Sequence, residues 1–256
     1  MTAPLFLVPP GSLADASPGQ IVTVEGAEAR HAVSVVRLRV GEVLYLGDGA
    51  GVRVLGEVAS ADPRSLEVRV TDVASAPAYG HELVLVQALA KGDRDEQAIE
   101  MATELGVDVV IPWQAERSVS QWRADKAARG RAKWEAVVTA ATKQSRRWTT
   151  PLVRPLATTE EVCRVLTFAD LSLVLHEEAT ERLNAQALPE VGRIVVVVGP
   201  EGGISAVELD RLRAVGAVPV RLGTEVLRTS SAGPAALAVL ASRLRWGRPG
   251  DEPSLG

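Results

Sequence analysis

The first part of the chain alternates apolar and polar residues in short runs. Four such runs occur at residues 21–24, 43–46, 52–55 and 66–70, with turn-forming residues between them at 47–49 and 62–63. Alternation with a period of two is typical of half-buried β-strands. The pattern predicts a small β-rich domain over residues 1–73, folded as a closed or curled barrel. A linker of mostly small residues follows at 74–80.

Beyond the linker the pattern changes to strands that alternate with helices. Short, mostly apolar runs at 83–89, 107–112, 171–176 and 194–199 predict strands. The continuous β-branched run at 194–198 is typical of a strand buried on both faces of a parallel sheet. Apolar or small residues at helical spacing over 93–105 predict a helix that ends at Gly106. We therefore expect an α/β domain over residues 81–250 and a tail at 251–256. Ligands of such a domain bind beyond the carboxyl ends of its strands.

The composition is that of an ordinary globular protein. The 256 residues are 46% hydrophobic, with 28 Lys and Arg against 32 Asp and Glu, so the formal net charge is −4. This excludes a disordered or fibrous protein. Cys163 stands alone, and the three histidines show no metal-ligand spacing with it. No apolar run is long enough for a membrane span, and the N-terminus lacks signal-peptide features. We expect a complete cytoplasmic protein with neither metal nor membrane segment.

The net charge hides a basic stretch between Trp113 and Arg154. Ten Lys or Arg face three acidic residues there, and four of the five tryptophans lie in the same stretch. On one helix over 125–147, five basic side chains would share an arc of about 100°: Lys126, Arg129, Lys133, Lys143 and Arg147. Such a face suits RNA phosphates, and aromatic rings stack on unpaired bases. The alternative is a solvated face beside a tryptophan core, and Trp134 in particular has a core position.

Three loops follow strand-like runs, at 175–179, 199–205 and 222–231. Glycines in the second loop let the backbone approach a ligand, and Ser205 with Glu208 forms a capping-box pattern that predicts the next helix. The alternative is that these are the ordinary strand-to-helix turns of any α/β domain. Neither GxGxxG nor the P-loop pattern occurs, which argues against a dinucleotide fold and against ATP hydrolysis.

Several short motifs occur in a fixed order along both domains. The first domain carries Arg30-His31, Arg37-Leu-Arg39-Val-Gly41 and Gly47-Asp48-Gly49. The second carries Ala90-Lys91-Gly92-Asp93-Arg94, Ala102-Thr103-Glu104-Leu105-Gly106-Val107, Glu116-Arg117-Ser118-Val119, Gln144-Ser145-Arg146, and the three loops. In this order and spacing the sequence resembles, almost end to end, the RsmE family of small-subunit ribosomal RNA uridine-N3 methyltransferases, within the SPOUT class.

The resemblance implies a fold and an activity. The expected fold is a PUA-like RNA-binding β-barrel followed by a SPOUT α/β domain with a C-terminal trefoil knot. The expected reaction is S-adenosyl-L-methionine-dependent methylation of N3 of a specific uridine in 16S rRNA, within the small ribosomal subunit. A homodimer with its active site at or near the subunit interface is also implied. The cofactor would be bound by Leu175, His176, Glu177, Gly199, Pro200, Glu201, Gly202, Gly203, Leu222, Gly223, Leu227 and Arg228.

Roles follow from the chemistry of the acceptor. Uridine N3 carries a weakly acidic imide proton, so a base or a cation that stabilises the anion is useful. Arg228 is the candidate for the anion or a substrate phosphate, and Glu201 is the candidate base. Candidate RNA contacts are Arg30, His31, Arg37, Arg39, Lys91, Arg94, Arg117, Lys143, Arg146 and Arg147. For the four residues of the first domain, a solvated turn is the alternative.

Three departures from the family pattern occur. The N-terminus keeps Phe6 but lacks the usual early arginine, a basic residue near Met101 is missing, and residues 229–234 replace a Thr-rich stretch while keeping small hydroxyls. Two other functions stay open. One is another SPOUT activity, such as ribose 2′-O methylation of transfer RNA. The other is an RNA-binding protein that has lost its cofactor, against which the intact glycine loops argue.

Overall fold

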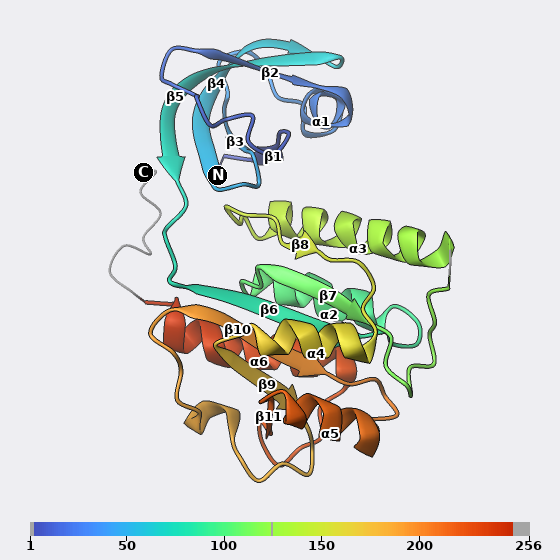
Figure 1. Cartoon of the computed structure of the whole chain (residues 1–256). Helices are drawn as coiled ribbons and strands as arrows, with labels where there is room; N and C mark the ends of the chain where they lie inside the picture. The colour runs from blue at the N-terminus through green and yellow to red at the C-terminus, as the bar shows by residue number, and fades with distance from the viewer. Residues whose placement is uncertain (1–2, 124, 248–256) are drawn as a thin grey trace. The chain divides into compact units, whose positions relative to one another are not determined.

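The computed structural model describes residues 3–123 and 125–247, which form two compact units (Figure 1). Of these residues, the first unit holds 3–78 and 142–150, and the second holds 79–141 and 151–247. The chain thus passes between the units at residue 78, inside the segment predicted as a linker. Residues 142–150 belong to the first unit, although the sequence pattern assigns them to the second domain. The predicted tail at 251–256 lies outside the described residues.

The first unit contains the strands that the alternation predicts. They form a five-stranded sheet of order β1-β3-β4-β5-β2, with β1 parallel to β3 and the other pairs antiparallel. Their bounds are β1 Leu5–Leu7, β2 Ile21–Glu25, β3 Val43–Gly47, β4 Val52–Asp62 and β5 Ser65–Ser75. Alternate residues such as Leu44 and Leu46 of β3 are fully buried. The four predicted strands are therefore confirmed, and β5 extends into the predicted linker.

The long hairpin of β4 and β5 is irregular at two places. Its register shifts twice, once at Gly56 and once before Ser60. A Cβ atom at Gly56 would lie 2.4 Å from Cγ1 of Val68 and 2.8 Å from the carbonyl oxygen of Arg69. Only glycine allows Val68 and Arg69 to come this close, so the register shift at residue 56 depends on glycine there.

A helical segment carries the first basic motif. Helix α1 (Gly26–Arg30) runs directly into the π-helix η1 (His31–Val36), which ends at Arg37 with φ of 65°. Ala29 and Ala32 are fully buried, whereas Arg30, Arg37 and Arg39 are exposed. The small residues thus anchor the segment, and the arginines point to solvent.

The second unit is built on a six-stranded, wholly parallel sheet of order β11-β9-β10-β6-β7-β8. The strands are β6 His81–Ala88, β7 Val109–Trp113, β8 Leu152–Val153, β9 Leu171–Leu175, β10 Gly192–Val198 and β11 Val218–Val220. The helices are α2 Arg94–Glu104, α3 Asp125–Gln144, α4 Thr159–Thr167, η2 Leu183–Ala185, α5 Ala206–Ala214 and α6 Thr229–Leu244. The predicted strands and the helix that ends at Gly106 are confirmed.

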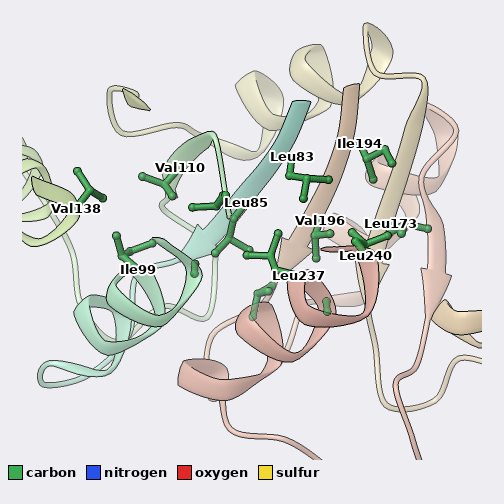
Figure 2. Packing of buried hydrophobic residues seen from close by; sticks show 14 of the residues in the cluster. Leu83, Leu85, Ile99, Val110, Val138, Leu173, Ile194, Val196, Leu237 and Leu240 are labelled. Atoms are coloured by element: carbon green, nitrogen blue, oxygen red, sulfur yellow. The ribbon is translucent and has the colours of Figure 1, made fainter. Parts of the chain in front are cut away.

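The sheet is buried on both faces because its central strands are mostly apolar. Leu83 and Leu85 of β6 pack with Leu237 and Leu240 of α6 on one face (Figure 2). The intervening Val84 and Val86 face the other core, with the apolar residues of α4 and α5. Chain order reverses between β6 and β10, and open parallel sheets bind ligands beyond the carboxyl ends of strands at such a point.

Helix α3 is shorter than the single helix considered over 125–147. It ends at Gln144 in a Schellman motif, in which Arg146 has φ of 55° and its N–H donates to the carbonyl oxygen of Lys143. The N–H of Arg147 closes the motif on the carbonyl oxygen of Thr142, at 3.0 Å. Arg147 therefore lies outside the helix, and the five basic residues do not form one helical face.

Candidate active site

The three predicted ligand loops meet at one edge of the parallel sheet. Because β9, β10 and β11 are parallel and β9 lies between the other two, their carboxyl ends point to the same side. The loops that follow them line one cavity of about 790 Å³. All twelve residues predicted for the cofactor line it: Leu175, His176, Glu177, Gly199, Pro200, Glu201, Gly202, Gly203, Leu222, Gly223, Leu227 and Arg228.

The loop after β10 needs its glycines for packing. A Cβ atom at Gly199 would lie 2.7 Å from Cγ1 of Ile204, and one at Gly202 would lie 3.2 Å from Cβ of Arg117. The loop ends where Ser205 and Glu208 form the predicted capping box at the start of α5, which confirms that prediction. A tight, closely packed backbone turn therefore forms one wall of the cavity.

The cavity also offers unpaired backbone donors. Within the part of the chain that the structure describes, the N–H groups of Glu201, Gly202 and Gly223 have no hydrogen-bond acceptor. Backbone N–H groups in this state bind the oxygen and nitrogen acceptors of a ligand. Such donors suit the carboxylate, ribose and adenine groups of S-adenosyl-L-methionine.

Charged side chains of both signs line the cavity. Glu177, Glu178 and Glu225 are carboxylates, whereas Arg94, Arg117 and Arg228 carry positive charge. The carboxylates complement a cofactor that bears sulfonium and ammonium groups. The guanidinium groups complement an RNA phosphate or an anionic base. The donor set thus fits a cationic methyl donor together with an anionic acceptor.

Glu201, the candidate base, is already engaged. Its Oε1 accepts from the backbone N–H of Lys91 at 3.1 Å and from Nη1 of Arg94 at 3.2 Å. The Glu201 side chain is 25% exposed, so this ion pair is only partly shielded from water. These contacts connect the loop after β10 with the loop before α2, and they favour a positioning role for the carboxylate.

Arg117 also contacts the loop after β10. Its Nη1 donates to the carbonyl oxygen of Gly202 at 3.1 Å. The neighbouring N–H of Glu116 donates to Oε1 of Glu208 at 2.9 Å, and the hydroxyl of Thr159 donates to the same oxygen at 2.8 Å. The sequence indicates Glu208 only as a capping residue. Its second role depends on contacts between distant segments, which no local pattern reveals.

Arg228 differs from these two arginines. It is the N-cap residue of α6, and its carbonyl oxygen accepts from Ser231 and Ala232. Its side chain is exposed, and no acidic partner pairs with it among the described residues. The guanidinium is therefore free to meet a ligand. An exposed, unpaired guanidinium is what we expect of Arg228 as the candidate that stabilises the substrate anion.

The candidate RNA contacts fall into two sets. Lys91, Arg94 and Arg117 lie in the second unit, the last two in the cavity lining. The first unit holds the other seven, of which five are exposed: Arg30, His31, Arg37, Arg39 and Arg146.

Lys143 is committed to a contact within the first unit. Its Nζ lies 2.8 Å and 2.9 Å from the two carboxylate oxygens of Glu28, and 5.7 Å from the centre of the Phe6 ring. Its side chain is only 21% exposed. The structure therefore favours a packing role for Lys143.

None of the four tryptophans of the basic stretch is fully exposed. Trp113 and Trp134 are buried, and Trp122 meets Trp134 edge to face with ring centres 5.4 Å apart. Trp148 stacks on the guanidinium of Arg53 at 4.1 Å. These contacts favour the core alternative over stacking on bases.

Two kinds of feature are absent from the residues that the structure describes. No helix there has the length and apolar character to cross a bilayer. No group of three or more His, Cys, Asp or Glu side chains in that part of the chain is arranged to hold a metal ion.

Two family profiles match the chain. An RNA methyltransferase domain covers residues 78–241, and an RNA methyltransferase PUA domain covers residues 24–71. Among curated proteins, the ribosomal RNA small subunit methyltransferase E of Mycobacterium tuberculosis is 43% identical over 96% of this chain and 94% of its own length. The protein of the same name from Bacillus subtilis is 28% identical over 86% of this chain and 89% of its own.

Solved structures show the same similarity. A ribosomal RNA small subunit methyltransferase E from Neisseria gonorrhoeae, bound to S-adenosyl methionine, superposes with a TM-score of 0.83 at 27% identity. The match covers 95% of this chain and 98% of that one. A methyltransferase from Legionella pneumophila, also with bound cofactor, gives the same TM-score and coverage at 26% identity.

Proposed function

Because the chain belongs to the RNA methyltransferase family that includes ribosomal RNA small subunit methyltransferase E, we propose that it methylates small-subunit (16S) ribosomal RNA with S-adenosyl-L-methionine. One observation carries this proposal. The loops after three strands line one cavity. This lining contains both carboxylates and Arg228, an arginine whose side chain makes no ion pair within the described residues. Groups of both kinds complement a methyl transfer between a cationic donor and an anionic acceptor.

Finer features of the proposal follow from the family resemblance. The acceptor atom is N3 of one uridine, and the substrate is presented within the small ribosomal subunit. The first unit closes into a PUA-like barrel, and the second forms a SPOUT domain with a C-terminal trefoil knot. The enzyme works as a homodimer in the cytoplasm.

The cavity residues would hold the cofactor by backbone and carboxylate contacts. The N–H groups of Glu201, Gly202 and Gly223 bind its acceptor atoms, and Glu177 or Glu225 attracts its cationic groups. When bound, S-adenosyl-L-methionine supplies a methyl group activated by the positive sulfur. The loops hold donor and acceptor in line, and this positioning supplies much of the rate of such a displacement.

Arg228 acts on the acceptor. As the N3 proton leaves, negative charge spreads over the two carbonyl oxygens of uracil, and the Arg228 guanidinium stabilises that charge. Glu201 holds Arg94 in the cavity lining, where Arg94 and Arg117 bind the RNA backbone. In this assignment the proton passes to solvent, because Glu201 is occupied by its two donors.

The test is methylation of small ribosomal subunits from a strain that lacks this protein, followed by mass mapping of the RNA. We expect one N3-methyluridine to appear only when both protein and cofactor are added. A methyl group on a ribose 2′-oxygen of transfer RNA would instead identify another SPOUT activity. Calorimetry with S-adenosyl-L-methionine covers the remaining alternative, because a chain that binds RNA but no cofactor is not this enzyme.

A further inference from the structure

A buried amide lies directly behind the proposed cofactor cavity. Gln87 is the single polar residue in the run from Leu83 to Ala88, and its side chain is completely buried near the carboxyl end of β6. The sheet register pairs Gln87 with Val198, the last residue of β10. The amide is therefore level with the point where the chain leaves β10 and enters the loop that begins at Gly199.

Hydrogen bonds connect this amide to two other elements. Nε2 of Gln87 donates to the hydroxyl oxygen of Thr229 at 3.0 Å, and that hydroxyl donates to the carbonyl oxygen of Gly199 at 2.8 Å. Thr229 is the first residue of α6, directly after Arg228, and is only 7% exposed. The relay from Gln87 through Thr229 to Gly199 thus joins the ends of β6 and β10 to the start of α6.

The amide of Gln87 lowers stability in a way that an apolar side chain at this position would not. Oε1 of Gln87 is buried, and no group among the described residues donates a hydrogen bond to it. Burying such an acceptor is unfavourable, and an apolar side chain of similar size would avoid the penalty. Helix α6 also packs tightly here, because a Cβ atom at Gly233 would lie 3.0 Å from Leu85 and 3.4 Å from that same oxygen. An incompletely satisfied buried amide is expected where a specific geometry matters more than stability.

The relay acts on the first peptide of this loop, at Gly199. Gly199 has no side chain to restrict its rotation, and the residues that follow it carry the unpaired N–H groups of Glu201 and Gly202. A hydrogen bond to the Gly199 carbonyl oxygen sets the direction in which the loop leaves the sheet. The same hydroxyl fixes the first turn of α6, and with it the backbone of Arg228.

We propose that Gln87 is a positioning residue of the cofactor site, which acts through Thr229 to fix both the loop after Gly199 and the start of α6. This inference rests on the proposed function for its ligand, S-adenosyl-L-methionine. The loop geometry itself is measurable without any ligand, so the role of Gln87 and the proposed function can fail separately.

Three variants of the full-length chain test the relay. Gln87→Leu removes the amide at similar volume, Thr229→Val removes the hydroxyl at constant shape, and Thr229→Ser retains the hydroxyl as the matched control. Backbone 15N relaxation without cofactor reports the order of the Gly202 and Gly203 amides. Gly216, at the end of α5, is the internal reference. Calorimetry gives the Kd for S-adenosyl-L-methionine, and thermal unfolding gives the stability.

For Gln87→Leu and Thr229→Val we expect the order parameters of Gly202 and Gly203 to fall from about 0.85 toward about 0.6, with Gly216 unchanged. The Kd should rise about five- to tenfold, the value of one neutral hydrogen bond. Thr229→Ser should stay within about twofold of the parent chain. The unfolding midpoint of Gln87→Leu should be equal to or above that of the parent, because the unpaired oxygen is gone.

Parent-like order parameters in both relay-breaking variants would overturn the inference. So would a midpoint that falls by more than about 5 °C while loop order and Kd stay the same, because the amide would then be purely structural. If Gln87→Leu does not fold, the comparison of Thr229→Val with Thr229→Ser decides by the same measurements. A looser loop in a chain whose parent binds no cofactor would support the relay and contradict the proposed function.

Discussion

Burial of a single carboxyl group, Asp95, makes the stability of the second unit depend on pH. Asp95 lies in the first turn of α2, 4% exposed, and its Oδ1 accepts from the N–H of Glu96 at 2.9 Å. Burial raises the pKa of Asp95 from 3.8 to about 6, although the backbone hydrogen bonds from Glu96 and Ala90 oppose the rise. The folded chain therefore keeps a proton on Asp95 that the unfolded chain loses at lower pH.

Replacing Asp95 by Asn should remove this pH dependence. Between pH 3.8 and about 6 the folded state binds more protons, so the free energy of unfolding falls as the pH rises, and the full penalty is present above pH 6. We expect Asp95→Asn to raise the free energy of unfolding at pH 8 by about 1–3 kcal/mol, with a smaller gain at pH 4.5. Urea unfolding across this range measures it. An equal change at both pH values would contradict the assignment.

Arg228 is the residue on which the proposed chemistry most depends. We expect Arg228→Ala to lower kcat/KM for ribosomal RNA by roughly a hundredfold, the typical loss when one charge-stabilising donor is removed. The Kd for the cofactor should change only a few-fold, because backbone groups provide much of its binding. Arg213→Ala is the matched control, since Arg213 is an exposed arginine of α5 outside the cavity lining. Normal methylation by Arg228→Ala at saturating cofactor would make the assignment wrong.

Sequence reasoning found the residues that line the cavity but not those that support them. The glycines and charged residues of the three loops follow strands, so local pattern and family resemblance place them together. Gln87 and Thr229 are 142 residues apart, and Lys143 and Glu28 are 115 apart. Such pairs depend on how distant segments meet, and no periodicity along the chain encodes that meeting.

At the scale of elements, α3 shows how a tertiary contact overrides helix propensity. Gly130 lies inside the helix, where glycine costs about 1 kcal/mol relative to alanine. A Cβ atom at that position would lie 2.4 Å from Cε2 of the Trp122 indole, which itself packs on Trp134. The glycine that weakens the prediction of a helix is thus the residue that lets Trp122 pack against it.

We therefore expect Gly130→Ala to destabilise the protein by about 1–3 kcal/mol, the usual cost of overpacking, despite its better helix propensity. In a Trp122→Ala background the same change should instead stabilise by up to about 1 kcal/mol. Ala128→Gly, at an exposed position of α3, controls for propensity alone. Thermal unfolding of the four-member cycle measures the coupling. A stabilising Gly130→Ala in the parent chain would show that Trp122 moves aside without cost.

The end of α3 could not be predicted for a related reason. Helix C-termini usually have glycine or asparagine in the left-handed position, but here Arg146 takes it. Its carbonyl oxygen accepts from Nη2 of Arg53 at 2.7 Å, and Arg53 stacks on Trp148. A contact from β4 thus offsets the strain, so the sequence near residue 146 contains no stop signal.

At the scale of the whole molecule, residues 142–150 change the charge of the first unit. Residues 3–78 contain six Arg and nine Asp or Glu, so this part alone is acidic. Residues 142–150 add one Lys and two Arg and no acid, which makes the described part of the unit neutral. A linear division at the linker therefore gives the wrong charge to the proposed RNA-binding unit. Residues 142–150 belong to the first unit through contacts that composition cannot reveal. One is the hydrogen bond from the N–H of Thr150 to the carbonyl oxygen of Gly49, at 2.8 Å.

If the first unit binds RNA through exposed cations, its exposed arginines and its half-buried Lys143 should behave differently. Arg39 is exposed, so Arg39→Gln should weaken binding of a small-subunit RNA fragment and reduce the slope of log K against log salt by about 0.7–0.9, one phosphate contact. Lys143 is paired with Glu28, so Lys143→Met should leave that slope unchanged and lower stability by about 1 kcal/mol. Fluorescence anisotropy between 50 and 200 mM salt, about the range where such slopes are resolved, measures both. Equal slope changes in the two variants would mean that Lys143 leaves Glu28 to bind RNA, and that charge in this unit is redistributed when the substrate binds.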